Sequence, residues 1–202
     1  MSAAAEQPPR SMRGPASIRV VVGYGFWIFL LSDIVMFSAF FAAYAVLSGA
    51  TAAGPGPREL FDMKRVGIET GCLLLSSFTC GVSYVGAQAR NAMVAQLGLL
   101  VTGLLGAVFV GLEVQEFAHM IAEGAGPQRS AFLSAFFALV GCHSLHVSVG
   151  LLWLGTMMAQ LWVKGFGPAI MRRLLCFNLF WHALDIIWVG LFTIVYLMGT
   201  LA

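Results

Sequence analysis

The sequence predicts an all-α membrane protein, a polytopic bundle of five transmembrane helices. Of the 202 residues, 59% are hydrophobic and 10% are charged, whereas soluble domains contain about 25% charged residues. Five apolar stretches reach the roughly 20 residues that a helix needs to cross a bilayer. The net charge of +2 is too small to indicate a nucleic-acid partner.

The five predicted spans cover residues 21–47, 66–89, 93–120, 130–163 and 174–199. A basic segment precedes the first span, as in a signal peptide. That span is longer than the roughly 7–15 apolar residues of a signal sequence, so we expect a retained helix. Residues 1–18 contain three prolines and no apolar period, which predicts a flexible cytoplasmic tail. Residues 19–202 are then expected to form a single membrane domain.

The breaks between the spans carry glycine, proline or charge. They are Gly54-Pro55-Gly56-Pro57, Arg90-Asn91, Gly124-Ala125-Gly126-Pro127 and the segment 164–173. The second break is so short that spans two and three must form a tight hairpin. Glycine is frequent, with 23 residues, and small residues let membrane helices approach closely. The four cysteines lie in apolar segments without a CxxC pair, which is typical of small packing residues.

Basic residues predict the orientation of the chain in the membrane. Five spans place the two termini on opposite sides. The N-terminal side would collect seven basic residues, namely Arg10, Arg13, Arg19, Arg90, Lys164, Arg172 and Arg173. The other side would have four, namely Arg58, Lys64, Arg65 and Arg129. This asymmetry favours a cytoplasmic N-terminus and a periplasmic C-terminus.

Five ionisable residues are predicted to lie deep in the membrane. They are Asp33, His143, His146, His182 and Asp185. At 1.5 Å per residue, Asp33 and Asp185 lie roughly 17–18 Å from the cytoplasmic edge, and His143 lies roughly 20 Å from the opposite edge. All five are therefore expected in one layer near the bilayer centre. Residues three apart share a helix face, so His143 and His146 point one way, as do His182 and Asp185.

This layer has several interpretations. It can be a structural polar cluster that fixes helix order, a proton relay or ion site, or a set of groups paired by lipid or by another subunit. A haem held between His182 and the histidines of span four is a further alternative. Against the haem, His143 and His146 point to one side of one helix.

Three carboxylates are predicted near the outer membrane edge. Span three ends with Glu113-x-x-Glu116-x-x-His119, and Glu69 opens span two at the same level. Glu-x-x-His is the spacing used in di-iron bundles, but those need a second copy and two further carboxylates. These residues could in principle ligate a metal. We expect hydrogen-bonded carboxylates near water instead.

Four blocks of the sequence resemble subunit III of the haem–copper terminal oxidases. They are Gly25–Asp33 (GFWIFLLSD), Gly111–Phe117 (GLEVQEF), Gly141–Val147 (GCHSLHV) and Phe180–Asp185 (FWHALD). Their order and spacing match over roughly residues 23–199. Within the family, the five-span length, the stretch FLSAFFALVG and the ending FTIVYLMG look most like the subunit of bo-type ubiquinol oxidases. The mitochondrial-type subunit has two further helices.

The resemblance implies an accessory role in a bacterial inner membrane. Family members carry no haem, copper or catalytic residue, pack beside the catalytic subunit I, and hold phospholipid. The complex would oxidise ubiquinol, reduce oxygen to water and pump protons, with haem and copper in subunit I. Asp33 takes the place of the family's buried carboxylate, and His143, His146, His182 and Asp185 match structural positions. Ser144 departs from the family's more usual glycine.

Other functions remain open from the sequence. The chain could be the corresponding subunit of a nitric oxide reductase or of a cytochrome c oxidase. A stand-alone transporter could use the mid-membrane acids, although the inverted repeat frequent in transporters is not visible. A di-iron or haem enzyme is the remaining alternative.

Overall fold

The computed structural model describes residues 17–52, 54, 56 and 60–201, and regular secondary structure in these ranges is helical throughout. The elements are α1 (Ile18–Leu47), α3 (Met63–Gln88), α4 (Ala92–Ala122), α5 (Ala131–Lys164), α6 (Pro168–Leu191), the π-helix η2 (Phe192–Leu197) and α7 (Met198–Leu201). The predicted flexible tail, residues 1–18, falls almost entirely on residues 1–16, which lie outside the described residues.

The all-α fold with five membrane-spanning helices is confirmed. Five helices of the described chain are long and apolar enough to cross a bilayer, the last one running from Pro168 to Thr200. Most of the predicted span ends lie within three residues of the helix ends. The fifth helix begins at Pro168, six residues before the predicted start. A proline fits the first turn of a helix, where its missing N–H would have no partner.

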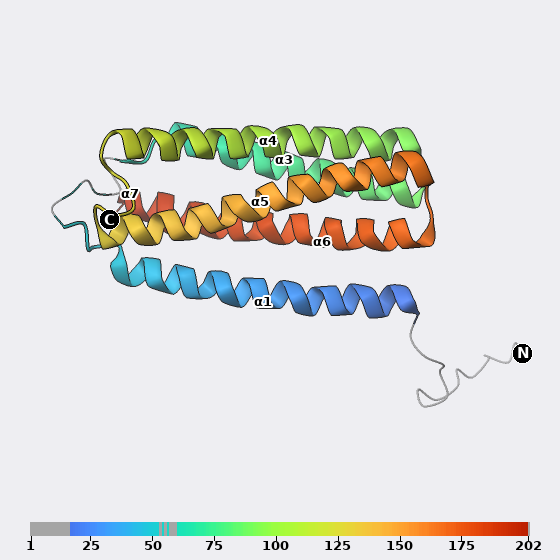
Figure 1. The fold of residues 1–202 in the computed structure, drawn as a ribbon, viewed down its shortest axis with the longest axis horizontal. Coiled ribbons are helices and arrows are strands. Elements are labelled where there is room, and N and C mark those ends of the chain that lie inside the picture. Colours follow the sequence, from blue (N-terminus) through green and yellow to red (C-terminus); the bar gives the residue numbers. More distant parts are fainter. Residues whose placement is uncertain (1–16, 53, 55, 57–59, 202) are drawn as a thin grey trace, which may run out of the picture.

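The helices run roughly parallel to one another, with α3 and α4 side by side on one flank (Figure 1). Both α5 and α6 occupy the middle, and α6 also packs against α3. Helix α1 lies at the opposite edge, where it contacts α5 and α6. Of the 30 residues of α1, only Leu30, Phe37 and Tyr44 are buried, so α1 is attached more loosely than the other four helices.

Small residues bring α3 and α4 into close contact. The turn Ala89–Asn91 joins them, with Arg90 at a positive φ of 56°. A Cβ on Gly98 would lie 2.7 Å from the Cβ and 2.9 Å from the Cα of Ser83. No side chain fits at such distances, so only glycine permits this approach.

Hydroxyl groups also tie α3 to its neighbours. Thr79 Oγ1 and Thr102 Oγ1 lie 2.8 Å apart between α3 and α4. From α6, the Trp181 indole N–H donates to Ser76 Oγ at 3.0 Å. Such hydrogen bonds hold membrane helices together where the surrounding lipid offers no competing water. The α3–α4 pair is therefore a well-anchored frame for any polar group placed on it.

Candidate functional site

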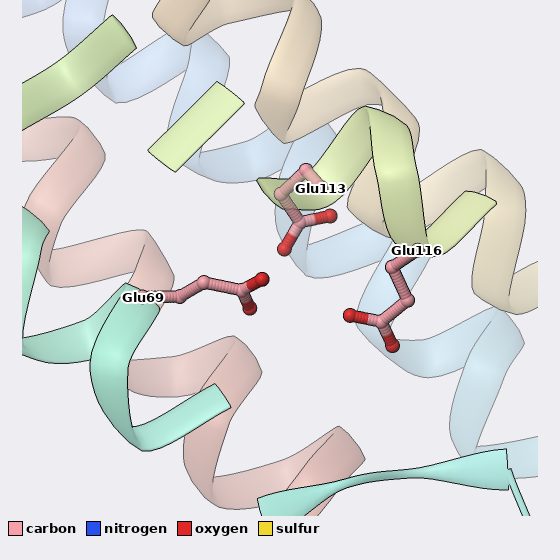
Figure 2. A group of neighbouring side chains, drawn as sticks. All are labelled: Glu69, Glu113 and Glu116. Carbon is pink, nitrogen blue, oxygen red and sulfur yellow. The ribbon is translucent and has the colours of Figure 1, made fainter. Parts of the chain in front are cut away.

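Glu69, Glu113 and Glu116 form a cluster between α3 and α4. Glu69 lies on the first two turns of α3, and the other two lie on the last turns of α4, because the hairpin brings these ends together. One carboxylate oxygen of each residue lies within 4.8 Å of the others. Figure 2 shows the three side chains converging on the space between the helices. Exposed fractions of 0%, 0% and 7% make this an interior cluster.

Arg65 is the basic partner of the cluster. Its Nε atom lies 3.5 Å from Glu69 Oε1 and 4.0 Å from Glu116 Oε2. The Nη2 group donates instead to the carbonyl oxygen of Leu112 at 2.5 Å. Arg65 therefore supplies one positive charge at the edge of the cluster, while its closest hydrogen bond goes to the backbone of α4.

The carboxylate oxygens of the cluster lack hydrogen-bond donors. None of the six oxygens of Glu69, Glu113 and Glu116 has a partner in the part of the chain that the structure describes. The hydroxyl of the fully buried Tyr196 is equally unpartnered, and it interacts electrostatically with all three carboxylates. Tyr196 belongs to the π-helix η2, and π-helical turns frequently mark functional sites.

The cluster differs from the expectation of hydrogen-bonded carboxylates near water. An aromatic group closes this end of the bundle, in which the Phe61 ring lies 4.7 Å from Tyr196 and 5.0 Å from Phe136. Distance from the helix end therefore overestimates the access of water. His119 is not part of the group: it is exposed, and its Nε2 lies 3.4 Å from Glu123 Oε1.

His143 is the fully buried member of the predicted mid-membrane layer. Its ring stacks on Trp188 of α6 at a centroid distance of 5.4 Å. Phe109 of α4 and Phe37 of α1 approach it edge-on at 5.9 and 6.3 Å. Both ring nitrogens lack a hydrogen-bond partner among the described residues. His143 thus sits where four helices meet, and aromatic rings take the place of the predicted polar partners.

The other four residues of the predicted layer are half-buried and separate into two groups. His146 Nδ1–H donates to the Cys142 carbonyl oxygen of its own helix at 2.7 Å, and Asp33 interacts electrostatically with Cys142. His182 Nδ1 lies 2.8 Å from the Asn178 carbonyl oxygen. His182 and Asp185 face a groove of about 790 Å³ beside α3 and α4. The position of a residue along its helix predicts its depth in the membrane. It does not predict which neighbouring helix the side chain faces.

These arrangements differ in what they can do chemically. Three converging carboxylates beside one arginine can hold a cation or retain protons, since their charges are not balanced by Arg65 alone. The imidazole of His143, enclosed by rings, is suited to packing. Sequence reasoning missed Arg65 and Tyr196 as members of the cluster. The i, i+4 spacing of Arg65 and Glu69 could have indicated that Arg65 belongs to the cluster.

Comparison with known proteins places the chain in a family. The model of the cytochrome c oxidase subunit III family matches residues 11–200. The chain is 52% identical to cytochrome bo(3) ubiquinol oxidase subunit 3 of Pseudomonas aeruginosa, over 88% of this chain and 85% of that protein. It is 44% identical to quinol oxidase subunit 3 of Bacillus subtilis, over 87% and 86% of the two chains. A further relative, cytochrome bo(3) ubiquinol oxidase subunit 3 of Buchnera aphidicola subsp. Baizongia pistaciae, is 43% identical over 87% and 90%. With five membrane-spanning helices and a match along nearly its whole length, the chain belongs to the cytochrome c oxidase subunit III family.

Proposed function

We propose that the chain is the accessory, non-redox subunit III of a proton-pumping bo-type ubiquinol oxidase. The observation that carries this proposal is 52% identity, over 88% of the chain, to a protein named as subunit 3 of such an oxidase. In this assignment the partner subunit I holds the haem and copper, oxidises ubiquinol and reduces oxygen. This chain packs beside subunit I and stabilises it.

The surroundings of the histidines support a role without redox chemistry. The His143 ring packs against the rings of Phe37, Phe109 and Trp188. His146 and His182 turn Nδ1 toward carbonyl oxygens of their own helices. A haem needs two axial ligands aimed at one iron from facing helices, or one ligand with an open distal side. The histidines of the described chain are not arranged in either way.

A groove between α1, α5 and α6 supports the binding of phospholipid. It has a volume of about 320 Å³ and is lined by apolar side chains, including Phe26 and Trp153, together with Arg172 and Arg173. The apolar wall suits an acyl chain and the guanidinium groups suit a phosphate. We propose that one phospholipid lies here and fills the space beside the loosely packed α1.

The charge distribution supports a bacterial inner membrane with the N-terminus in the cytoplasm. Arg19, Arg90 and Arg172 line one pocket at the end of the bundle where α1 begins. The acidic cluster lies toward the other end, where α4 finishes. Basic residues favour the cytoplasmic side. In this proposal residues 1–18 are a cytoplasmic tail and residues 19–202 one membrane domain with its C-terminus in the periplasm.

Purification through an affinity tag on this chain tests the assignment. We expect the chain to bring down a haem–copper subunit, and the complex to consume oxygen when ubiquinol is supplied. Nitric oxide turnover without quinol oxidation would assign the chain to a reductase instead. Transport by the chain alone in liposomes would also overturn the proposal.

A further inference from the structure

We propose that Glu69, Glu113 and Glu116, together with the hydroxyl of Tyr196, form a binding site for one divalent cation, for which Ca²⁺ is the best fit. The site lies within this chain and does not depend on which oxidase the chain joins. Its ligands come from α3, α4 and η2, three segments that are distant in the sequence. A bound cation would therefore link α3, α4 and η2.

Charge balance is the first argument for a cation. The three carboxylates carry three negative charges when ionised, and Arg65 supplies one positive charge. Asp62 acts on Glu116 as a further negative group, but it is exposed and its side chain caps α3. Two positive charges are therefore missing from the interior of the cluster. One divalent cation provides both.

The unpartnered oxygens are the second argument. All six carboxylate oxygens lack donors within the described chain, and Glu69 and Glu113 are fully buried. Only Glu69 Oε1 and Glu116 Oε2 lie within ion-pair distance of Arg65, and neither is hydrogen-bonded to it. Buried polar atoms nearly always have a partner, so this set of carboxylate oxygens needs an explanation. Ca²⁺ takes 6–8 oxygen ligands, and carboxylates can supply one oxygen or two each.

Distance between the oxygens is the third argument. One oxygen of each carboxylate lies within 4.8 Å of the others. Two ligands on opposite sides of Ca²⁺ lie about 4.6–5.2 Å apart, so one ion can contact all three residues. Mg²⁺ spans about 4.0–4.2 Å and usually keeps several waters. A cluster buried within the bundle suits the larger ion, which depends less on retained water.

Tyr196 is an independent indication of a ligand. Its hydroxyl is fully buried, has no hydrogen-bond partner in the described chain, and interacts with all three carboxylates. The π-helical turn Phe192–Leu197 shifts the direction of this side chain relative to a regular helix. A neutral oxygen that interacts with the carboxylates can add a ligand without adding charge.

Arg65 marks the route by which a cation can enter. Its side chain is 29% exposed, whereas the Glu69 side chain behind it is 0% exposed. The hydrogen bond to the Leu112 carbonyl holds the guanidinium against α4, at the rim of the site. The positive charge lies beside Glu69 and Glu116, with Nε 3.5 Å and 4.0 Å from their nearest carboxylate oxygens.

Ca²⁺ binding to the intact membrane complex tests the proposal. After treatment with EGTA, equilibrium dialysis with radioactive Ca²⁺ should give one site that the variant Glu113→Gln weakens by about tenfold or more, since ligand charge sets affinity. Glu123→Gln is the matched control, because Glu123 follows the same helix but is exposed and pairs with His119. Equal Ca²⁺ binding by the wild type and Glu113→Gln would overturn the proposal.

A measurement on the wild-type complex covers the case in which Glu113→Gln fails to assemble. Infrared difference spectra with and without Ca²⁺ should show a carboxyl C=O band that disappears when Ca²⁺ is added, as protons give way to the cation. Terbium, which replaces Ca²⁺, should show luminescence sensitised by Tyr196 and the neighbouring Trp188, whose rings lie 6.1 Å apart. A carboxyl band that persists at saturating Ca²⁺, together with no sensitised terbium emission, would mean that the cluster holds protons and no cation.

Discussion

The acidic cluster and the His143 pocket both hold buried polar groups, but the two regions stabilise these groups differently. His143 can remain neutral, so three neighbouring helices surround it with aromatic rings, and its nitrogens have no hydrogen-bond partner in the described chain. An unmet hydrogen bond of this kind costs about 1–3 kcal/mol. Three carboxylates that share one space repel one another and need positive charge from elsewhere. In our proposal the first region is complete within this chain, whereas the second takes up a cation.

Helix packing explains why the two regions can coexist. In the His143 pocket, α1, α4, α5 and α6 are held together by the packing of aromatic rings. The cluster instead lies between α3 and α4, whose close approach Gly98 permits. Changes at the α3–α4 contact should therefore affect the cluster, and changes in the rings should affect the pocket.

The largest effect is expected from Gly98→Leu, which should disrupt the acidic cluster and leave the His143 pocket less affected. A side chain here meets the Ser83 backbone within 3 Å, so α3 and α4 must separate. Overpacking costs about 1–3 kcal/mol or more. The temperature at which the subunit leaves the purified complex should fall strongly, and Ca²⁺ binding should be lost. Gly111→Leu is the control, since a Cβ there meets nothing within 4 Å.

His143→Ala should disrupt the His143 pocket and leave the acidic cluster intact. The substitution leaves a cavity between Phe37, Phe109 and Trp188, and large-to-small changes in a core cost about 2–5 kcal/mol, with His143 expected near 3. Thermal release of the subunit measures the loss, while Ca²⁺ binding should be unchanged. His143→Phe keeps a flat aromatic ring of only slightly larger size, and the ring nitrogens have no partner to lose, so it should cost less than His143→Ala. If His143→Phe is as harmful as His143→Ala, the histidine has a polar role.

Arg65→Gln should have a smaller effect, and only on the acidic cluster, because it removes a positive charge beside the carboxylates. Losing the positive charge at the rim should raise Ca²⁺ affinity several-fold, because the cluster becomes more negative. Without Ca²⁺ the variant should be less stable by about 1 kcal/mol, since the Leu112 carbonyl loses a charged donor. Titration with Ca²⁺ and thermal release measure the two quantities. A drop in affinity would mean that Arg65 organises the ligands.

The smallest effect is expected from Asp33→Asn. Asp33 is half-buried on the loosely packed α1 and lies outside both regions. Quinol oxidation and proton pumping should stay intact, and retention of the subunit should weaken at most. Oxygen uptake and pH changes in vesicles provide the measurement. Immediate loss of pumping in an intact complex would assign Asp33 a role in proton movement.

Much of the fold could be predicted because membrane helices need long apolar stretches. The five spans followed from this rule, and the late predicted start of the fifth resulted from reading Arg172 and Arg173 as part of a loop. The common level of Glu69, Glu113 and Glu116 was also predictable from distance along the helices. Their burial was not, since it depends on how α3 and α4 pack against the rest of the bundle, which distance along a helix does not reveal. Partners of His143 were missed because depth contains no information on helix rotation.

The accessory role is tested most directly by removing this chain from the purified oxidase. Haem content and the initial rate of ubiquinol oxidation would be compared before and after removal. We predict that the remaining complex keeps its haems and its initial rate, and then loses activity faster with time. Loss of haem absorption or of oxygen reduction from the first turnover would contradict the proposal that this chain has no part in the redox chemistry.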